Sequence, residues 1–223
     1  MMQRIFDVVF TSLALLVLSP LMIPLVIILR FSGEGEIFYK QNRVGIKGKS
    51  FGLLKFATML KNSPNLGTGN MTVKNDPRIL PLGNFLRKTK INELPQLLNI
   101  FLGDMSLIGP RPLTKDLFDG YISSVQQAIA SVQPGLSGIG SIVFRAEEEM
   151  LHQHADARNF YREFISPYKG NLEVWYAENK GLLIYFTLII LTVWVVIFPK
   201  SKAAWNIFPS LPKPPLALEK YFL

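Results

Sequence analysis

Two long apolar runs dominate the pattern of hydrophobic and polar positions along the chain. Residues 5–29 read IFDVVFTSLALLVLSPLMIPLVIIL. As a helix they would extend ~37 Å, against ~30 Å for the hydrocarbon core of a bilayer. Residues 182–198 read LLIYFTLIILTVWVVIF, which lies at the lower limit for a membrane span. The pattern therefore predicts two membrane-associated helices.

Ser19 and Pro20 interrupt the first run near its middle. Pro20 has no N–H for the carbonyl of Leu16 and its ring crowds the preceding turn, so we expect a kink or a break there. The Ser19 hydroxyl could donate a hydrogen bond to a carbonyl freed in this way. A kinked single span and a re-entrant helix, which enters and leaves on the same side, both fit this pattern.

The middle of the chain predicts a small hairpin followed by helices. Residues 36–59 read as two strands around a turn at Gly45–Gly48. A helix is expected over residues 114–132, an extended stretch over 141–150, and further helix over 151–180 with breaks near Pro167 and Gly170. The expected fold is a helix-rich α+β protein.

From Asn92 onward the apolar positions take helical spacing. Asn92 is a favourable N-cap, Glu93 suits the positive end of the helix dipole, and Gly103 ends the pattern. The expected apolar face consists of Leu94, Leu97, Leu98, Phe101 and Leu102. Helix capping is therefore a sufficient structural explanation for the pair Asn92-Glu93.

Composition narrows the classes of function. Hydrophobic residues make up 49% of the 223 residues, and the absence of cysteine excludes disulfides, thiol catalysis and cysteine-based zinc sites. The net charge is +8, and residues 40–90 hold eleven Lys or Arg against one acid, Asp76. Such a block suits anionic lipid, nucleic acid or a nucleotide diphosphate. Nucleic acid is disfavoured because residues 74–100 contain a single aromatic, Phe85.

The charges also bear on membrane topology. Arg4 precedes the first apolar run, the basic block follows it, and the tail carries Lys200, Lys202, Lys213 and Lys220. The positive-inside rule places all three regions on the cytoplasmic side, whereas two true spans would force the middle region outside. Monotopic attachment keeps all three regions on the cytoplasmic side. The expected organisation is a re-entrant membrane helix at 1–30, a cytoplasmic catalytic domain at 31–180, and an apolar interfacial helix with a basic tail at 181–223.

The stretch 87–112 has the composition of a phosphate site. A helix N-terminus near Asn92 would offer free N–H groups to an anion, with Arg87, Lys88 and Lys90 close by in sequence. Two prolines stiffen the backbone around Arg111, as a fixed guanidinium would require. Glu93, a carboxylate among cations, suggests a divalent metal that also contacts phosphates. An ion pair with a nearby acid is the alternative for Arg111.

In order and spacing, several motifs resemble the bacterial sugar transferases, or monotopic phosphoglycosyl transferases. They are an apolar segment broken at SP, then QNRVGIKGKSFGLLKFATM, NDPR, LRKTKINELPQLLN, GDMSLIGPRP and PGLSGIG. The resemblance implies transfer of a phosphosugar from a UDP-sugar to polyprenyl phosphate, with release of UMP and use of Mg²⁺. It also implies a re-entrant first helix, interfacial later helices, and the cytoplasmic face of the bacterial inner membrane.

Carried over by motif, the resemblance assigns roles to particular residues. It implies helix-breaking roles for Ser19 and Pro20, a catalytic dyad at Asn92 and Glu93 with Glu93 on the metal, and substrate or phosphate binding for Lys55, Arg87, Pro110, Arg111 and Arg145. The chain departs from the family pattern at Ala57, where an arginine is usual, and in GSIVFRAEEE. Asn92 stands where the family has its aspartate nucleophile, and an amide cannot form an acyl phosphate.

Three hypotheses remain. The first is an active transferase in which Glu93 replaces the nucleophile or the lipid phosphate attacks directly. The second is a non-catalytic member of the family that binds nucleotide sugar or polyprenyl phosphate. The third, a membrane-anchored basic module, is disfavoured by the ordered motifs. The expected partners are a UDP-sugar, polyprenyl phosphate and membrane lipids, with no nucleic acid; a homo-oligomer is left open.

Overall fold

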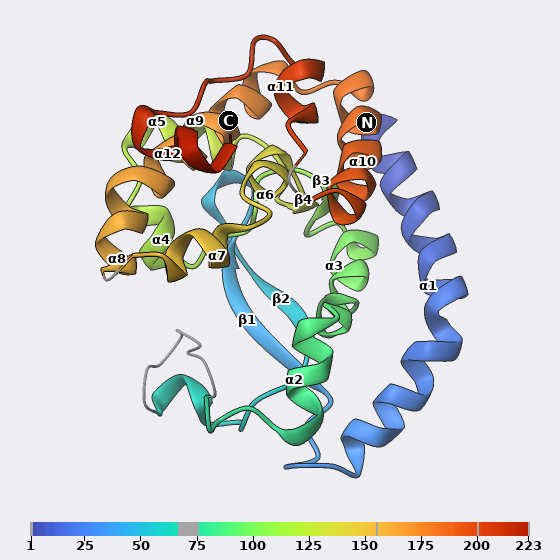
Figure 1. Cartoon of the computed structure of the whole chain (residues 1–223). Helices are drawn as coiled ribbons and strands as arrows, with labels where there is room; N and C mark the ends of the chain where they lie inside the picture. Colours follow the sequence, from blue (N-terminus) through green and yellow to red (C-terminus); the bar gives the residue numbers. More distant parts are fainter. Residues whose placement is uncertain (1, 67–75, 155, 200, 223) are drawn as a thin grey trace. The chain divides into compact units, whose positions relative to one another are not determined.

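The computed structural model describes residues 2–66, 76–154, 156–199 and 201–222 (Figure 1). The chain forms two compact units. The N-terminal unit comprises residues 6–42 and 52–103, and the C-terminal unit comprises the chain from residue 104 on, with residues 43–51 and the first turn. The structure is helix-rich α+β, as the sequence predicts.

The first helix, α1 (Met2–Arg30), runs without interruption through Pro20 and Pro24. The expected break at Pro20 is therefore wrong at the level of secondary structure, although the helix is bowed along its length in Figure 1. The Ser19 hydroxyl donates to the carbonyl of Leu16 at 2.7 Å, which confirms the expected repair. This bond satisfies the carbonyl that Pro20 leaves without a donor, so the helix can continue.

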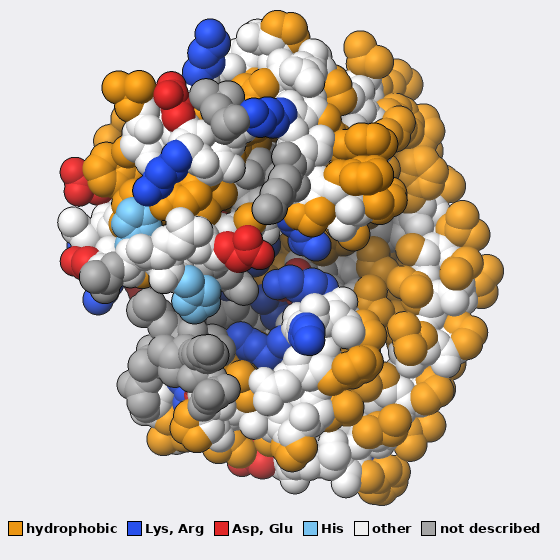
Figure 2. Space-filling view, in the orientation of Figure 1, with side chains coloured by type: hydrophobic (Ala, Val, Ile, Leu, Met, Phe, Trp, Pro, Cys, Tyr) orange, Lys and Arg blue, Asp and Glu red, His pale blue; other side chains and the backbone are white. Residues whose placement is uncertain are grey.

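One stripe of α1 packs into the core of the N-terminal unit, where Leu25 and Leu29 contact Phe56 and Leu86. The rest of the helix is exposed, and Figure 2 shows apolar side chains along its visible face. Only 11% of its most apolar 18-residue window is buried, and α1 is long and apolar enough to cross a membrane by length and composition. An ordinary core helix would be buried on most of its faces.

The expected hairpin is confirmed. Strands β1 (Phe38–Val44) and β2 (Ser50–Phe56) form a two-stranded sheet, joined through a short 3-10 turn at Ile46–Gly48. Lys47 and Gly48 both have positive φ angles, 57° and 70°, which reverse the chain direction in few residues.

After the hairpin the N-terminal unit continues through short elements: a 3-10 turn at Ser63–Asn65, α2 (Pro81–Lys88), a 3-10 turn at Ile91–Glu93, and α3 (Gln96–Leu102). Gly103 ends α3 at φ 100°, as expected. The expected apolar face is wrong in part, because Phe101 and Leu102 are exposed whereas Gln96 and Asn99 are buried. The 3-10 turn winds more tightly than an α-helix, so it shifts the phase of the helix that follows.

The C-terminal unit is built around α9 (Ser166–Asn179), which packs against α5 (Ser123–Ala130) and α6 (Ile139–Val143). The other elements are β3 (Ser106–Ile108), α4 (Lys115–Asp119), β4 (Gly135–Ser137), α7 (Glu147–His152), α8 (Ala157–Phe160), a π-helical turn (Tyr161–Ile165), α10 (Leu182–Ile197), α11 (Ala203–Ile207) and α12 (Leu216–Phe222).

Three sequence expectations fail in this unit. The helix expected over 114–132 is two helices, α4 and α5, separated at Gly120 and the two residues after it. The stretch 141–150, expected to be extended, lies largely in α6 and α7. Pro167 starts α9 rather than breaking a helix, because proline is tolerated in the first turn, and α9 continues through Gly170.

The second apolar run forms α10, which packs by one face. Tyr185, Leu188 and Leu191 are buried, and the helix contacts α6 and β3, whereas Leu183 and Ile190 on other faces are exposed. At 16 residues α10 is shorter than α1. The run therefore supplies core to the C-terminal unit while leaving an apolar surface outside it.

Candidate functional site

Lys55 and Glu93 form the ion pair at the centre of the candidate site. Lys55 Nζ lies 3.5 Å from Glu93 Oε1, and the two side chains are 19% and 22% exposed. Lys55 comes from β2 and Glu93 from the 3-10 turn before α3. Both side chains of the pair are therefore partly accessible to solvent.

Asn99 fixes the distance between the two elements that carry this pair. Its side-chain oxygen accepts from Leu54 N at 2.9 Å, and its amide donates to Gly52 O at 2.8 Å. Both bonds go to the backbone of β2, one of them to the residue just before Lys55. Asn99 is 1% exposed, so water does not compete for these bonds. Asn99 thus clamps α3 to β2.

Arg87, from α2, lies in the same unit, half-buried. Its Nη1 is 3.5 Å from the hydroxyl of Thr58. The helix approaches Thr58 closely because Gly83 has no side chain: a Cβ there would lie 2.2 Å from the Thr58 carbonyl oxygen. The sequence stretch LGNFLR therefore needs its glycine to bring Arg87 to this place.

Asn92 is buried at 7% exposure, and its Oδ1 has no hydrogen-bond partner among the described residues. The expectation that Asn92 caps a helix is wrong: the 3-10 turn makes no side-chain cap, and α3 begins after Pro95. Lys90 precedes the turn at φ 62°, a strained conformation for a residue other than glycine. An oxygen buried without a donor suits a site that a cation or a donor completes on binding.

The segment that carries Pro110 and Arg111 is fixed in the C-terminal unit by a short parallel sheet. β3 pairs with β4, with Ser106 opposite Gly135 and Ile108 opposite Ser137. The contact continues past the end of β3, where Pro110 O accepts a hydrogen bond from Gly135 N at 2.8 Å. The motifs SLIGPRP and PGLSG, far apart in sequence, are therefore two halves of one structure.

Pro110 is buried, whereas the side chains of Arg111 and Arg145 are exposed. Just after Arg111, Pro112 O accepts a hydrogen bond from Arg43 Nη1 at 3.1 Å. Arg145 follows α6 directly, one residue after the buried Phe144. The structure thus presents two arginines from rigid supports in this unit, while Lys55, Arg87, Asn92 and Glu93 belong to the N-terminal unit.

The NDPR motif has a structural role. The Arg78 guanidinium pairs with Asp76 at 2.6 Å, and both side chains are almost fully buried. Arg78 also donates to the carbonyls of Ser63 and Leu66 at 2.8 and 2.7 Å. These bonds tie the Asp76–Arg78 turn to the backbone of Ser63 and Leu66, which is a structural role.

The acidic residues limit the kind of metal the site could hold. The described part of the chain has no cluster of three or more His, Cys, Asp or Glu side chains able to hold a metal by itself. Glu93 offers one carboxylate, and Asn92, the residue before it, offers a neutral oxygen that has no hydrogen-bond partner in the described part of the chain. Mg²⁺ in phosphate chemistry commonly takes one or two carboxylates and completes its shell with water and substrate phosphates, so this donor set fits Mg²⁺.

Sequence reasoning missed Asn99 and Glu173. Asn99 lies between Leu98 and Ile100 in an otherwise apolar run, and a buried polar residue in such a place is a detectable signal. Glu173 lies in LEVWY, again an acid among apolar residues, and is 5% exposed. Both lie in apolar stretches of the sequence, unlike Lys55, Arg87 and Glu93, which lie in or beside the basic block.

Comparison with known proteins places these features in context. A profile described as bacterial sugar transferase matches residues 1–199. The chain is 38% identical over 156 residues to exopolysaccharide production protein ExoY of Rhizobium meliloti, covering 64% of this chain and 69% of that protein.

Two further relatives carry names that state a reaction. The undecaprenyl-phosphate galactose phosphotransferase of Salmonella typhimurium is 32% identical over 88% of this chain and 40% of its own length. The UDP-glucose:undecaprenyl-phosphate glucose-1-phosphate transferase of Escherichia coli is 32% identical over 79% of this chain and 38% of its own length. The chain thus spans about two fifths of these two proteins.

Proposed function

The chain belongs to the bacterial sugar transferase family, and on that premise we propose that it transfers a phosphosugar from a UDP-sugar to polyprenyl phosphate. The products are polyprenyl diphosphate sugar and UMP. The observation that carries the proposal is the Lys55–Glu93 ion pair, with Asn92 next to Glu93 in the chain and its side-chain oxygen buried without a partner among the described residues. The names of the galactose- and glucose-phosphate transferases among the relatives support the reaction class.

The reaction moves one phosphoryl group and needs no redox partner. An oxygen of the polyprenyl phosphate attacks the β-phosphorus of the UDP-sugar, and the bond from that phosphorus to the bridging oxygen breaks. UMP leaves with that oxygen and the electron pair. Positioned cations stabilise the negative charge on the phosphoryl oxygens during transfer, a role for Lys55 and Arg87 in the N-terminal unit.

Mg²⁺ is part of the proposal. When bound, it would neutralise charge on the diphosphate and hold its oxygens in place. Glu93 and the Asn92 side-chain oxygen are the residues that would hold it, because one is a carboxylate and the other an unpartnered buried oxygen. Lys55 pairs with Glu93 at 3.5 Å and so limits the positions that the carboxylate can take.

Asn92 limits the chemical routes by which the phosphosugar can be transferred. As an amide it cannot accept the phosphoryl group, so the phosphosugar either passes directly to the lipid phosphate or rests transiently on Glu93. A second function is favoured by the same residue: a non-catalytic member of the family that binds nucleotide sugar or polyprenyl phosphate.

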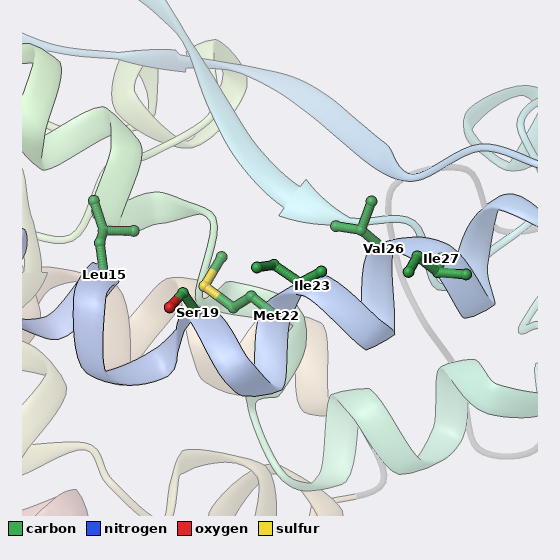
Figure 3. A pocket seen from close by; sticks show the side chains of 6 residues that line it. All are labelled: Leu15, Ser19, Met22, Ile23, Val26 and Ile27. Carbon is green, nitrogen blue, oxygen red and sulfur yellow. The ribbon is translucent and has the colours of Figure 1, made fainter.

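We further propose monotopic attachment at the cytoplasmic face of the bacterial inner membrane. The exposed apolar surface of α1 and the basic residues after it support this. A hollow along α1 is lined by Leu15, Ser19, Met22, Ile23, Val26 and Ile27 (Figure 3). Ser19 is the sole polar residue in that lining, so the hollow suits an apolar chain such as a polyprenyl tail.

The test is an assay of UMP release with the purified chain in lipid nanodiscs, a panel of UDP-sugars, and polyprenyl phosphate added or omitted. Lipid-dependent UMP release is expected with Mg²⁺ and not with EDTA. Glu93→Gln should lower kcat/KM at least a hundredfold, because it removes the carboxylate that binds metal and pairs with Lys55. A phosphosugar adduct in the intact mass without lipid would assign the route through Glu93.

No turnover with any donor, together with micromolar binding of a UDP-sugar, would establish the non-catalytic alternative. In that case Asn92→Asp should restore the nucleophile type, and UMP release by this variant alone would identify one amide as the reason for inactivity. Release of UDP instead of UMP would contradict the proposed phosphosugar transfer.

A further inference from the structure

Glu173 is a buried acid that none of the motifs includes. It lies on α9, is 5% exposed, and its Oε2 has no hydrogen-bond partner among the described residues. Burying a carboxyl group with an unsatisfied oxygen costs free energy, because both oxygens would accept hydrogen bonds in water. The residues around Glu173 indicate what the buried acid does.

α9 holds the segment around Arg111 at two points. The hydroxyl of Tyr176 donates to the carbonyl of Ile108 at 3.0 Å, and the backbone N–H of Arg111 donates to the carboxyl group of Glu173. Since Pro110 and Pro112 have no N–H, the Arg111 amide is the one backbone donor between Gly109 and Leu113. Glu173 therefore accepts a hydrogen bond from the backbone N–H of the residue that carries the guanidinium.

Gly140, on α6, makes room for this contact. A Cβ at residue 140 would lie 2.3 Å from Glu173 Oε1. Any larger residue would therefore displace the carboxyl group from its place. The second glycine of SGIG, Gly140, is therefore needed because a side chain there would collide with Glu173.

The charged and titratable groups around Glu173 come from several elements. Lys169 lies one turn earlier on α9 and is paired with Glu147 of α7. Tyr121 lies between α4 and α5 and interacts electrostatically with Glu173 and Glu147. Tyr161 lies in the π-helical turn and interacts electrostatically with Glu147 and Arg111. Burial raises the pKa of Glu173 to about 8 against the opposing influence of Lys169 and Arg111.

We propose that Glu173 is a positioning residue: its carboxyl group accepts the Arg111 N–H and so fixes the backbone from which the Arg111 guanidinium extends to bind phosphate. This inference rests on the proposed function for its consequence, but not for its geometry. Both the neutral and the ionised carboxyl group can accept the Arg111 N–H. The contact therefore requires a hydrogen-bond acceptor of this size at residue 173 and not a particular charge.

Hydrogen exchange tests the geometry without any substrate. In a peptide covering residues 108–113, the Arg111 amide should exchange at least tenfold faster in Glu173→Ala than in the unsubstituted chain. Glu173→Gln, which keeps a neutral acceptor of the same size, should retain the protection. Equal protection in all three chains would overturn the proposal.

Kinetics test the consequence. Glu173→Ala should lower kcat/KM for the UDP-sugar at least tenfold at pH 7, whereas Glu173→Gln should stay within about twofold. A loss in Glu173→Gln as large as that in Glu173→Ala would show that an acceptor at residue 173 does not position Arg111, and would overturn the proposal.

A steric test separates positioning from general stability. Gly140→Ala should reproduce the exchange and kinetic defects of Glu173→Ala, and combining the two should be no worse than either alone, because the methyl then fills the vacated space. Gly120→Ala is the matched control, since the nearest atom to its Cβ is at 3.4 Å. Additive defects in the double variant would contradict the direct contact. Should the unsubstituted chain turn over no donor, the proposed function fails and hydrogen exchange alone decides the role of Glu173.

Discussion

Asn99 shows how a single amide positions the candidate site without touching a substrate. Its two bonds to the backbone of β2 fix the turn that carries Glu93 beside Lys55. The bonds are buried, so replacing the amide leaves a donor and an acceptor without partners or water.

We therefore expect Asn99→Leu to lower the free energy of unfolding by ~2–6 kcal/mol, at about 1–3 kcal/mol for each of the two orphaned groups. It should also reduce transferase activity, because Lys55 and Glu93 lose their fixed separation. Chemical denaturation and the UMP assay measure the two effects. Asn84→Ala, on the exposed side of α2, is the control and should change stability by less than about 0.5 kcal/mol. Unchanged stability in Asn99→Leu would show that the clamp is not formed.

Glu173 makes a prediction on stability against pH that needs no activity. Its pKa is about 8 in the folded protein and 4.5 at the usual value, so the folded state holds the extra proton between these limits. This contribution to stability is complete at low pH and is lost as pH rises through the folded pKa. The stability of Glu173→Gln relative to the unsubstituted chain should thus increase from about pH 5 to pH 8 and then level off. A constant difference over that range would mean that Glu173 titrates normally.

At the scale of elements, the sequence pattern identifies the hairpin and the long apolar helices but not the boundaries of the short helices. The hairpin could be predicted because Gly45 and Gly48 bracket a turn between two strand-like runs. The helix expected over 114–132 could not be divided correctly, since its apolar spacing continues across Gly120 while the backbone does not.

The residues of the candidate site were likewise predictable only in part from the sequence. Lys55, Arg87, Glu93 and Arg111 could be proposed from charge and motif. The capping role of Asn92 was wrong because the backbone takes a 3-10 turn there, and a change of pitch is not visible in apolar spacing. Contacts between distant segments, such as Glu173 with Arg111, depend on packing that no local pattern encodes.

The last two helices, α11 and α12, lie beyond the residues that the family profile matches. They nevertheless supply core to the C-terminal unit: Leu218 is fully buried, and Phe222 stacks edge-on to Phe144 at 5.3 Å between ring centroids. Tyr221 and His154 are joined by a 2.8 Å hydrogen bond. This segment is integral to the unit and is not a loose tail.

Leu218→Ala should therefore lower the free energy of unfolding by ~2–5 kcal/mol, the range for a leucine truncated in a core. Leu216→Ala is the matched control two residues away on the same helix, where the side chain is 85% exposed. Its effect should stay within about 0.5 kcal/mol. Equal effects of the two substitutions in thermal or chemical denaturation would place α12 away from the core.

For the whole molecule, the membrane account requires that both apolar helices enter and leave on the cytoplasmic side. Because the chain has no cysteine, single cysteines at positions 2, 61 and 213 can be labelled without background. In intact cells all three should resist a membrane-impermeant reagent and react only after permeabilisation. Pro20→Leu should straighten α1 and move residue 2 to the periplasmic side. Periplasmic labelling of residue 2 or 213 in the unsubstituted chain would contradict monotopic attachment.

The central claim is that a phosphorus atom passes from the nucleotide to the lipid, and a labelled donor follows that atom directly. UDP-sugar carrying ³²P at the β-phosphate is incubated with the chain in nanodiscs that contain polyprenyl phosphate and Mg²⁺, and organic extraction separates lipid from nucleotide. The account predicts that the label enters the lipid in equal amount with the UMP released, and that Glu93→Gln abolishes both. Label that stays in the nucleotide as UDP while the sugar reaches the lipid would contradict it.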